Sequence, residues 1–185
     1  MYSIKLTVAT RSGYTVLSTC SKHNFDLVKS LGASEVFDYA DPNCGSKIRE
    51  YTNNKLKYAW DTISLETSAK ICAEALSSNP GGKYGTILPA KPPRDDLEVT
   101  NTLMYTIFNE EFQKGGRTTP ASKEDFEFAK KFFAITEKLM AEGKLKSHPE
   151  KVGEKGLQGV LEGMEDMKAG KVSGVKLVYK VADTP

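Results

Sequence analysis

The spacing of apolar residues switches repeatedly between two periods along this sequence. The stretch 35–39 alternates with period 2, which predicts a strand, whereas 66–78 repeats with the 3.6-residue period of a helix. Strands that alternate with helices are typical of an open parallel sheet covered by helices. The sequence therefore predicts an α/β protein.

The predicted elements follow one another with short turns between them. The sequence predicts helices at 2–11, 24–31, 44–53, 66–78, 123–142 and 156–170. It predicts strands at 14–18, 35–39, 55–63, 83–89, 97–101 and 174–181, and 55–63 is expected to be buried. A helix or irregular segment is expected near 102–113, a loop at 114–122 and an extended stretch at 145–153. The last elements, from 145 onward, are expected to form an appendage to the parallel sheet.

Composition and charge narrow the class of ligand. The 185 residues are 39% hydrophobic and 27% charged, and the net charge of +2 is spread without a basic block. Such a chain lacks the basic patch that would bind nucleic acid or an anionic membrane surface. No apolar run approaches the roughly 20 residues that span a bilayer, and the N-terminus lacks a signal-peptide layout. We therefore expect a cytoplasmic protein that binds a small molecule, with no nucleic acid and no membrane as partner.

The cysteines and histidines point to no metal site or nucleophile. Cys20, Cys44 and Cys72 are odd in number and widely spaced, so we expect reduced thiols that serve mainly in packing. His148 lies in an extended segment and is expected to pack or to meet solvent. Asp61, at a strand end, is more often a structural carboxylate than a proton donor. The sequence therefore supports no hydrolase, metalloenzyme or phosphotransferase.

A polar loop at residues 19–24, with the sequence TCSKHN, follows a predicted strand and precedes a helix. Ligands of open parallel sheets lie outside the carboxyl ends of the strands, where such loops meet helix N-termini. A carboxylate there would hold a free ribose 2′-hydroxyl, whereas hydroxyls and cations accommodate a 2′-phosphate. The loop contains no acid, so a bound dinucleotide is expected to be the phosphorylated form. The alternative is that Ser21 or Asn24 only caps the helix while Lys22 and His23 are solvated.

Several motifs together resemble a known family. They are SGYTVLSTCSKHNFDLVKSLGASEVFDY, YAWDTIS, GGKYGTILP, EGKLKSHPEKVGEKGLQGVLEGM and GKVSGVKLVYKV. Their order is similar to that in the C-terminal portion of fungal medium-chain dehydrogenase/reductases, and most of all to the zinc-independent, trans-acting enoyl reductases that partner polyketide synthases. The resemblance covers nearly the whole chain.

The resemblance implies a Rossmann-like parallel sheet that lacks its first strand and glycine-rich loop. It implies two regions: a partial NADP-binding domain at 1–144, and a C-terminal segment at 145–185 that would pack on an absent catalytic domain. The implied cofactor is NADP(H), and the catalytic residues stay unknown. The implied cofactor-binding residues are Ser21, Lys22, Asn24, Tyr39, Thr62, Ile63, Leu88 and Pro89. For Tyr39 the alternative is an aromatic ring that packs over a strand end.

The implied activity is NADPH-dependent reduction of a carbon–carbon double bond in an enoyl compound of polyketide-type metabolism. The implied partners are a small-molecule or carrier-bound enoyl substrate, a polyketide synthase and a second copy of the chain. This chain alone is expected to be inactive. Two alternatives stay open: a non-catalytic Rossmann-like interaction module or truncated product, and a reductase of quinones or aldehydes.

Overall fold

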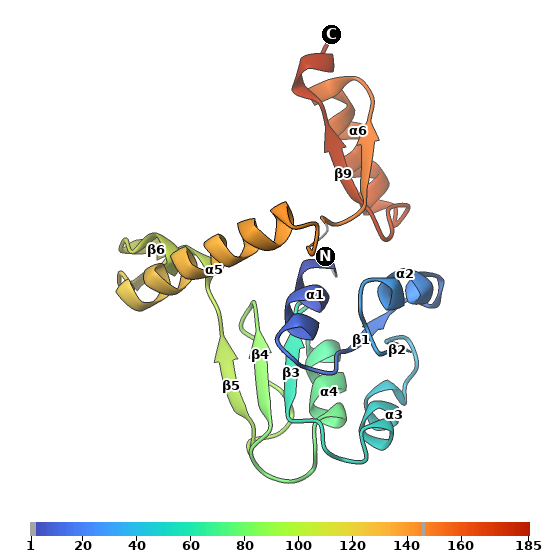
Figure 1. Ribbon diagram of the computed structural model, residues 1–185, viewed down its shortest axis with the longest axis vertical. Helices are drawn as coiled ribbons and strands as arrows, with labels where there is room; N and C mark the ends of the chain where they lie inside the picture. The colour runs from blue at the N-terminus through green and yellow to red at the C-terminus, as the bar shows by residue number, and fades with distance from the viewer. Residues whose placement is uncertain (1–2, 146) are drawn as a thin grey trace. The chain divides into compact units, whose positions relative to one another are not determined.

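The computed structural model describes residues 3–145 and 147–185, with no side-chain description for residues 3–5 (Figure 1). Residue 2 of the predicted first helix and residue 146 of the predicted extended stretch lie outside the described residues. The chain divides into two compact units, Phe37–Leu139 and Met1–Val36 with Met140–Pro185. These units differ from the division into 1–144 and 145–185, which stays a prediction. No helix in the described ranges is both long and apolar enough to cross a bilayer.

A three-stranded parallel sheet forms the centre of the unit Phe37–Leu139. Its strands lie in the order β3 (Tyr58–Asp61), β4 (Lys83–Thr86) and β5 (Glu98–Asn101). In the register, Asp61 lies opposite Thr86 and Thr86 lies opposite Asn101, so the three strands end at one edge. Parallel strands linked through helices confirm the predicted α/β class.

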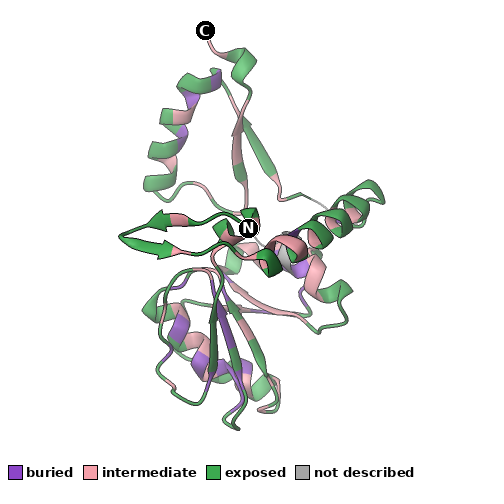
Figure 2. Ribbon diagram, turned by 90° about the vertical axis from the view of Figure 1, so that its left-hand side faces the viewer, coloured by how far each residue is buried: buried purple, intermediate pink, exposed green. Residues whose placement is uncertain are grey.

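The helices α3 (Cys44–Tyr51) and α4 (Glu66–Ala75) belong to the same unit. The core around α4 consists of Ala69, Ala73, Leu76, Tyr84 and Leu97. Figure 2 shows buried residues concentrated on this sheet and on the helix beside it. The carbonyl groups of Ala73 and Leu76 accept hydrogen bonds from the guanidinium groups of Arg49 and Arg94. Cations there complement the negative end of the α4 dipole.

The prediction that 55–63 is a buried strand is wrong in extent and in burial. Only Tyr58–Asp61 is a strand, and the side chains of Tyr58 and Trp60 are exposed. Side chains alternate between the faces of a strand, and Ala59 packs against the core while Tyr58 and Trp60 point to the other face. The apolar run therefore marks a strand with one buried face rather than two.

The remainder of this unit contains η2 (Met104–Phe108), β6 (Phe112–Lys114), β7 (Arg117–Thr119) and the start of α5 (Lys123–Ala141). The predicted loop at 114–122 is wrong, because β6 and β7 pair as an antiparallel hairpin. Its turn, Gly115–Gly116, has positive φ at both residues, the geometry that suits a two-residue hairpin turn. Each strand has only three residues, too few to give an alternating pattern.

The other unit begins with α1 (Ser3–Arg11), β1 (Leu17–Cys20), η1 (Lys22–Asn24), α2 (Phe25–Ser30) and the first half of β2 (Glu35–Asp38). Leu6, Cys20, Val28, Ala33 and Val36 form its core. The first strand begins three residues later than predicted, whereas the helix stop at Gly32 is confirmed by its φ of +109°.

The C-terminal elements are β8 (Glu150–Gly153), α6 (Gly156–Lys168), β9 (Lys176–Tyr179) and η3 (Val181–Asp183). The strands β8 and β9 pair in parallel and α6 connects them, so the segment is a β–α–β crossover. As predicted, this pair is separate from the three-stranded sheet.

Candidate functional site

The loop after β1 carries one group of the predicted cofactor residues, Ser21, Lys22 and Asn24. Ser21 has an extended backbone, and its carbonyl oxygen accepts a hydrogen bond from Asn24 N at 2.9 Å, which closes the short helix η1. Neither the side chain of Ser21 nor that of Asn24 caps a helix. The structure thus contradicts the alternative that these side chains serve as helix caps.

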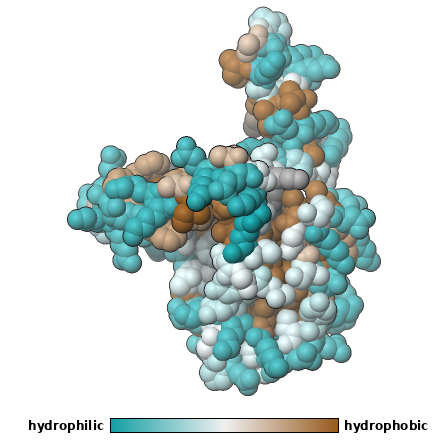
Figure 3. All heavy atoms as spheres, viewed as in Figure 1, coloured by the Kyte–Doolittle hydropathy of each residue, from teal (hydrophilic) through white to brown (hydrophobic). Residues whose placement is uncertain are grey.

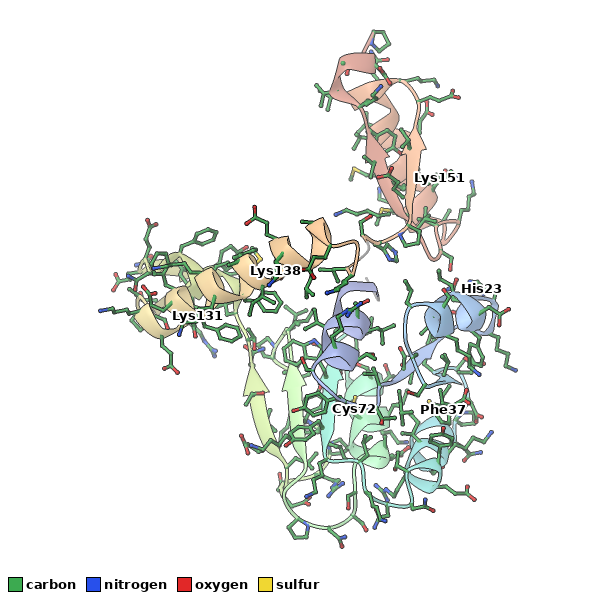
Figure 4. The ribbon with its side chains drawn as sticks, in the orientation of Figure 1. His23, Phe37, Cys72, Lys131, Lys138 and Lys151 are labelled. Atoms are coloured by element: carbon green, nitrogen blue, oxygen red, sulfur yellow. The ribbon has the colours of Figure 1, made fainter. Side chains whose placement is uncertain are left out.

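A serine far along the chain meets this loop within the same unit. Ser173 Oγ lies 2.7 Å from His23 Nε2 and accepts a hydrogen bond from Asn24 Nδ2 at 3.0 Å. Asn24 Nδ2 also lies 3.3 Å from His23 Nε2. His23, labelled in Figure 4, thus stands in a cluster of an imidazole, an amide and a hydroxyl. None of these three side chains is an acid.

Gly174 allows this close approach. Its φ is +69°, and a Cβ atom there would lie 2.8 Å from Asn24 Oδ1. Ser173 is not among the residues predicted from the sequence, because 149 positions separate it from Asn24. The signal was nevertheless present, since the Ser-Gly pair lies in the GKVSGVK motif on which the family resemblance partly rests.

Tyr39 directly follows β2 and is half exposed. Ala40 N donates a hydrogen bond to Asp38 Oδ1 at 2.9 Å, so Tyr39 lies within a turn stabilised by the preceding aspartate. Its contact with the adenosine part of a cofactor stays a prediction.

The turn after β3 is organised by the Asp61 carboxylate, which is 3% exposed. Its Oδ1 accepts hydrogen bonds from the backbone N–H groups of Ile63 and Ser64, each at 2.9 Å. Its Oδ2 accepts from Ser68 Oγ at 2.7 Å and from Tyr84 Oη at 2.8 Å. Desolvation would raise the pKa of Asp61, but these hydrogen bonds together lower it below the usual value. Asp61 is therefore an ionised structural carboxylate rather than a proton donor.

The turn after β4 lies beside the turn after β3. Ser64 Oγ lies 2.6 Å from Thr86 Oγ1, and Thr86 Oγ1 donates to the carbonyl oxygen of Leu88 at 2.7 Å. The backbone N–H groups of Ile87 and Leu88 donate to Ser64 Oγ at 3.3 and 3.2 Å. These bonds join the turn that carries Thr62 and Ile63 to the turn that carries Leu88 and Pro89.

Apolar side chains stand exposed on these joined turns. Ile63 is 58% exposed and Leu88 is 52% exposed, whereas Ser64 and Thr86 beneath them are buried. The geometry therefore brings together two pairs of the predicted cofactor residues at the carboxyl edge of the sheet. Their contact with a nicotinamide ring stays a prediction.

Burial shifts the pKa values of two cysteines and of His148. Burial is the main cause that raises the pKa of Cys44 to about 11 and that of Cys72 to about 12, so both thiols are protonated near neutral pH. Burial also lowers the pKa of His148. Within the part of the chain that is described, His, Cys, Asp and Glu form no group that could hold a metal ion.

Comparison with curated proteins identifies fungal relatives, although no family model matches the chain. The trans-enoyl reductase ACTTS2 of Alternaria alternata is 47% identical over 171 residues, which are 92% of this chain and 49% of that protein. The trans-enoyl reductase resD of Aspergillus sclerotiorum is 40% identical over 174 residues, which are 92% of this chain and 49% of that protein. The chain thus spans about half the length of these relatives.

Solved structures share the fold at low sequence identity. The CurF ER cyclopropanase from the curacin A biosynthetic pathway has a TM-score of 0.65 and 20% identity, over 93% of this chain and 50% of that one. A quinone oxidoreductase of Pseudomonas syringae pv. Tomato DC3000 has a TM-score of 0.68 and 18% identity, over 95% of this chain and 52% of that one. The chain is therefore a homologue of the fungal trans-enoyl reductases over about half of their length, and it shares the α/β fold of these two solved structures.

Proposed function

We propose that this chain is the NADP(H)-binding portion of a trans-acting enoyl reductase. The observation that carries the proposal is the acid-free polar cluster of His23, Asn24 and Ser173 at the end of β1. Hydroxyl, amide and imidazole groups suit a 2′-phosphate, and Lys22 adds a positive charge beside them. Ser21 is the fifth polar residue of this proposed phosphate site.

The relatives support the reaction class, because two of them are named trans-enoyl reductases. NADPH, when bound, supplies the hydride, and the protein holds its reactive end against the acceptor carbon. In this chain Ile63 and Leu88 present apolar side chains at the edge proposed for that end. The acceptor that we propose is an enoyl thioester, either free or bound to the carrier of a polyketide synthase.

A chimera tests the proposal. The N-terminal half of the Alternaria alternata relative, joined ahead of this chain, is expected to oxidise NADPH only when an enoyl thioester is present. The measurement is NADPH absorbance with an enoyl thioester, with the saturated thioester as the control acceptor. The 185-residue chain alone is expected to show no turnover, because the relatives are about twice its length.

The outcomes separate the alternatives. A folded chimera that binds NADPH but does not oxidise it with any of the acceptors tested would contradict enoyl reduction. That result would favour a non-catalytic interaction module. Oxidation with a quinone or an aldehyde but not with the enoyl thioester would assign a different reductase. A folded chimera that binds neither NADPH nor NADH would contradict the cofactor assignment as well.

A further inference from the structure

The hydroxyl groups of Ser64 and Thr86 form a closed ring with the backbone of Leu88. Each hydroxyl carries one proton, and the proton of Thr86 is donated to the Leu88 carbonyl oxygen at 2.7 Å. With that proton committed, the Ser64 hydroxyl is the donor in its 2.6 Å contact with Thr86 Oγ1. The carbonyl oxygen of Asp61, at 3.3 Å from Ser64 Oγ, is a second and longer acceptor. Ser64 Oγ in turn accepts from Leu88 N at 3.2 Å. Two buried hydroxyls thus hold both backbone polar groups of Leu88.

The backbone of Ser64 indicates that this arrangement is specified by its surroundings. Its φ of +58° lies in the left-handed region, which residues other than glycine rarely adopt. The Asp61 carboxylate holds it there by accepting the N–H group of Ser64 at 2.9 Å. Ser64 is only 7% exposed, so its hydroxyl is available to these protein partners rather than to solvent. Strained residues of this kind gather where a precise geometry is needed.

We infer that Ser64 is a positioning residue for the nicotinamide end of the cofactor, acting through Leu88 and Ile63; this inference rests on the proposed function. Ser64 does not touch the cofactor. Its hydroxyl fixes the distance between the turn after β3 and the turn after β4, and so the spacing of the two exposed apolar side chains at their tips. Both turns belong to the unit Phe37–Leu139.

Ser68 provides a matched control for Ser64. Its hydroxyl donates to the same carboxylate, Asp61 Oδ2, at 2.7 Å and accepts from Leu65 N at 3.0 Å. These hydrogen bonds, and a 3.0 Å contact with the carbonyl oxygen of Leu65, stay within the turn after β3, so Ser68 stabilises the first turn without joining it to the second. Loss of either hydroxyl removes hydrogen bonds near Asp61, but only loss of the Ser64 hydroxyl releases Leu88.

The experiment uses the 185-residue chain and two ligands, NADPH and 2′,5′-ADP, each titrated by calorimetry. 2′,5′-ADP carries the adenosine and the 2′-phosphate but has no nicotinamide. Ser64→Ala and Thr86→Val are expected to weaken NADPH binding about tenfold, as the loss of one net hydrogen bond would. Binding of 2′,5′-ADP is expected to stay within about twofold of the wild type, because this ligand has no nicotinamide end for the two hydroxyls to position.

Two variants serve as controls in the same titrations. Thr86→Ser keeps the hydroxyl at position 86, and Ser68→Ala leaves the hydrogen-bonded ring of Ser64, Thr86 and Leu88 intact. Both variants are therefore expected to retain the wild-type ratio of NADPH affinity to 2′,5′-ADP affinity. Equal weakening of both ligands by Ser64→Ala would overturn the inference, because it would show a general structural role. An unchanged NADPH affinity in Ser64→Ala would overturn it as well.

Hydrogen exchange separates this inference from the proposed function. In the ligand-free chain, Ser64→Ala is expected to speed exchange of the Leu88 amide more than Ser68→Ala does. If the wild type binds neither ligand, the proposed function fails and the inference fails with it, whatever the exchange shows. If the wild type binds both ligands and Ser64→Ala changes neither the affinities nor the exchange of Leu88, the inference alone fails.

Discussion

Asp61 shows how a nearly buried charge is stabilised at the edge of this sheet. Two backbone N–H groups and two hydroxyl groups donate to its carboxylate, at 2.7 to 2.9 Å. Hydrogen bonds to a charged group contribute more to stability than bonds between neutral groups, and they favour the ionised form.

Replacing Asp61 by Asn is expected to lower the free energy of unfolding by about 2–3 kcal/mol at pH 7, roughly one charged hydrogen bond. If the amide oxygen keeps the two backbone donors, an NH₂ group stands where Ser68 and Tyr84 both now donate. Urea denaturation measures the difference. The control is Asp95→Asn, because Asp95 is an exposed carboxylate paired with Lys91 at 3.4 Å. An equal effect at both positions would contradict the account.

The difference in the free energy of unfolding between wild type and Asp61→Asn is also expected to depend on pH. The folded-state pKa of Asp61 is lowered, so its stabilisation is fully present above the unfolded pKa of about 3.9. That stabilisation is lost as the pH falls through the folded-state pKa. The stability difference between wild type and Asp61→Asn should therefore be constant from pH 7 to about 5 and shrink in acid. A difference that grows in acid would show that the folded-state pKa is raised.

At the residue scale, the sequence could predict which residues lie just beyond the strand ends, but not the serine side chains that contact them. Ile63 and Leu88 follow strand ends, and strand ends are visible in the apolar pattern. Ser64 and Ser173 are single serines whose roles arise from partners 22 and 149 or more positions away. Such pairings depend on the register of the strands and on the path of the tail, which local patterns do not specify.

At the scale of elements, the crossover of β8, α6 and β9 depends on small residues beneath one aromatic ring. A Cβ atom on Gly163 would collide with Tyr179 Oη, and one on Gly153 would collide with the ring of Tyr179. A Cβ atom on Gly159 would collide with the carbonyl oxygen of Glu154 and would also lie close to that ring. The ring of Tyr179 thus fills a notch that only glycines leave open.

Gly163→Ala is expected to destabilise the chain by about 1–3 kcal/mol, the usual range for overpacking. The sign is informative, because alanine in a helix is otherwise favoured over glycine by roughly 1 kcal/mol. In a Tyr179→Phe background the colliding oxygen is gone, so the same substitution should cost less. Thermal unfolding of the four proteins measures this coupling, and a stabilising Gly163→Ala in the Tyr179 background would contradict the packing described.

Elements differed in how well the sequence predicted them. The helices α3, α5 and α6 were predicted closely, because their apolar periodicity extends over eight or more residues and turn residues mark their ends. The strands have three or four residues each, so their bounds were predicted less well. The hairpin of β6 and β7 was missed, although its Gly115–Gly116 turn is a hairpin signal.

At the scale of the whole molecule, apolar side chains remain at the surface of α5 and α6 (Figure 3). Phe128 on α5 is 66% exposed and Leu161 on α6 is 69% exposed. Apolar surface of this kind tends to be buried by association. We therefore expect the 185-residue chain to self-associate.

Sedimentation velocity over a range of protein concentrations measures this association. Phe128→Ser together with Leu161→Ser should shift the chain toward monomer without a large loss in the free energy of unfolding. The control is Lys131→Ser, an exposed polar position on α5 that is labelled in Figure 4. A wild-type monomer at high concentration that binds no hydrophobic dye would contradict the expectation.

The central claim is that this chain recognises the 2′-phosphate of NADPH through the loop after β1. The most direct measurement is the ratio of NADPH to NADH affinity by calorimetry, in the wild type and in Ser21→Asp. One good charged hydrogen bond of roughly 1.5–3 kcal/mol predicts a preference for NADPH of about 10- to 150-fold. A carboxylate at position 21 should abolish or reverse that preference with little effect on folding. Equal affinities in the wild type, or a ratio unchanged by Ser21→Asp combined with Lys22→Ala, would contradict the claim.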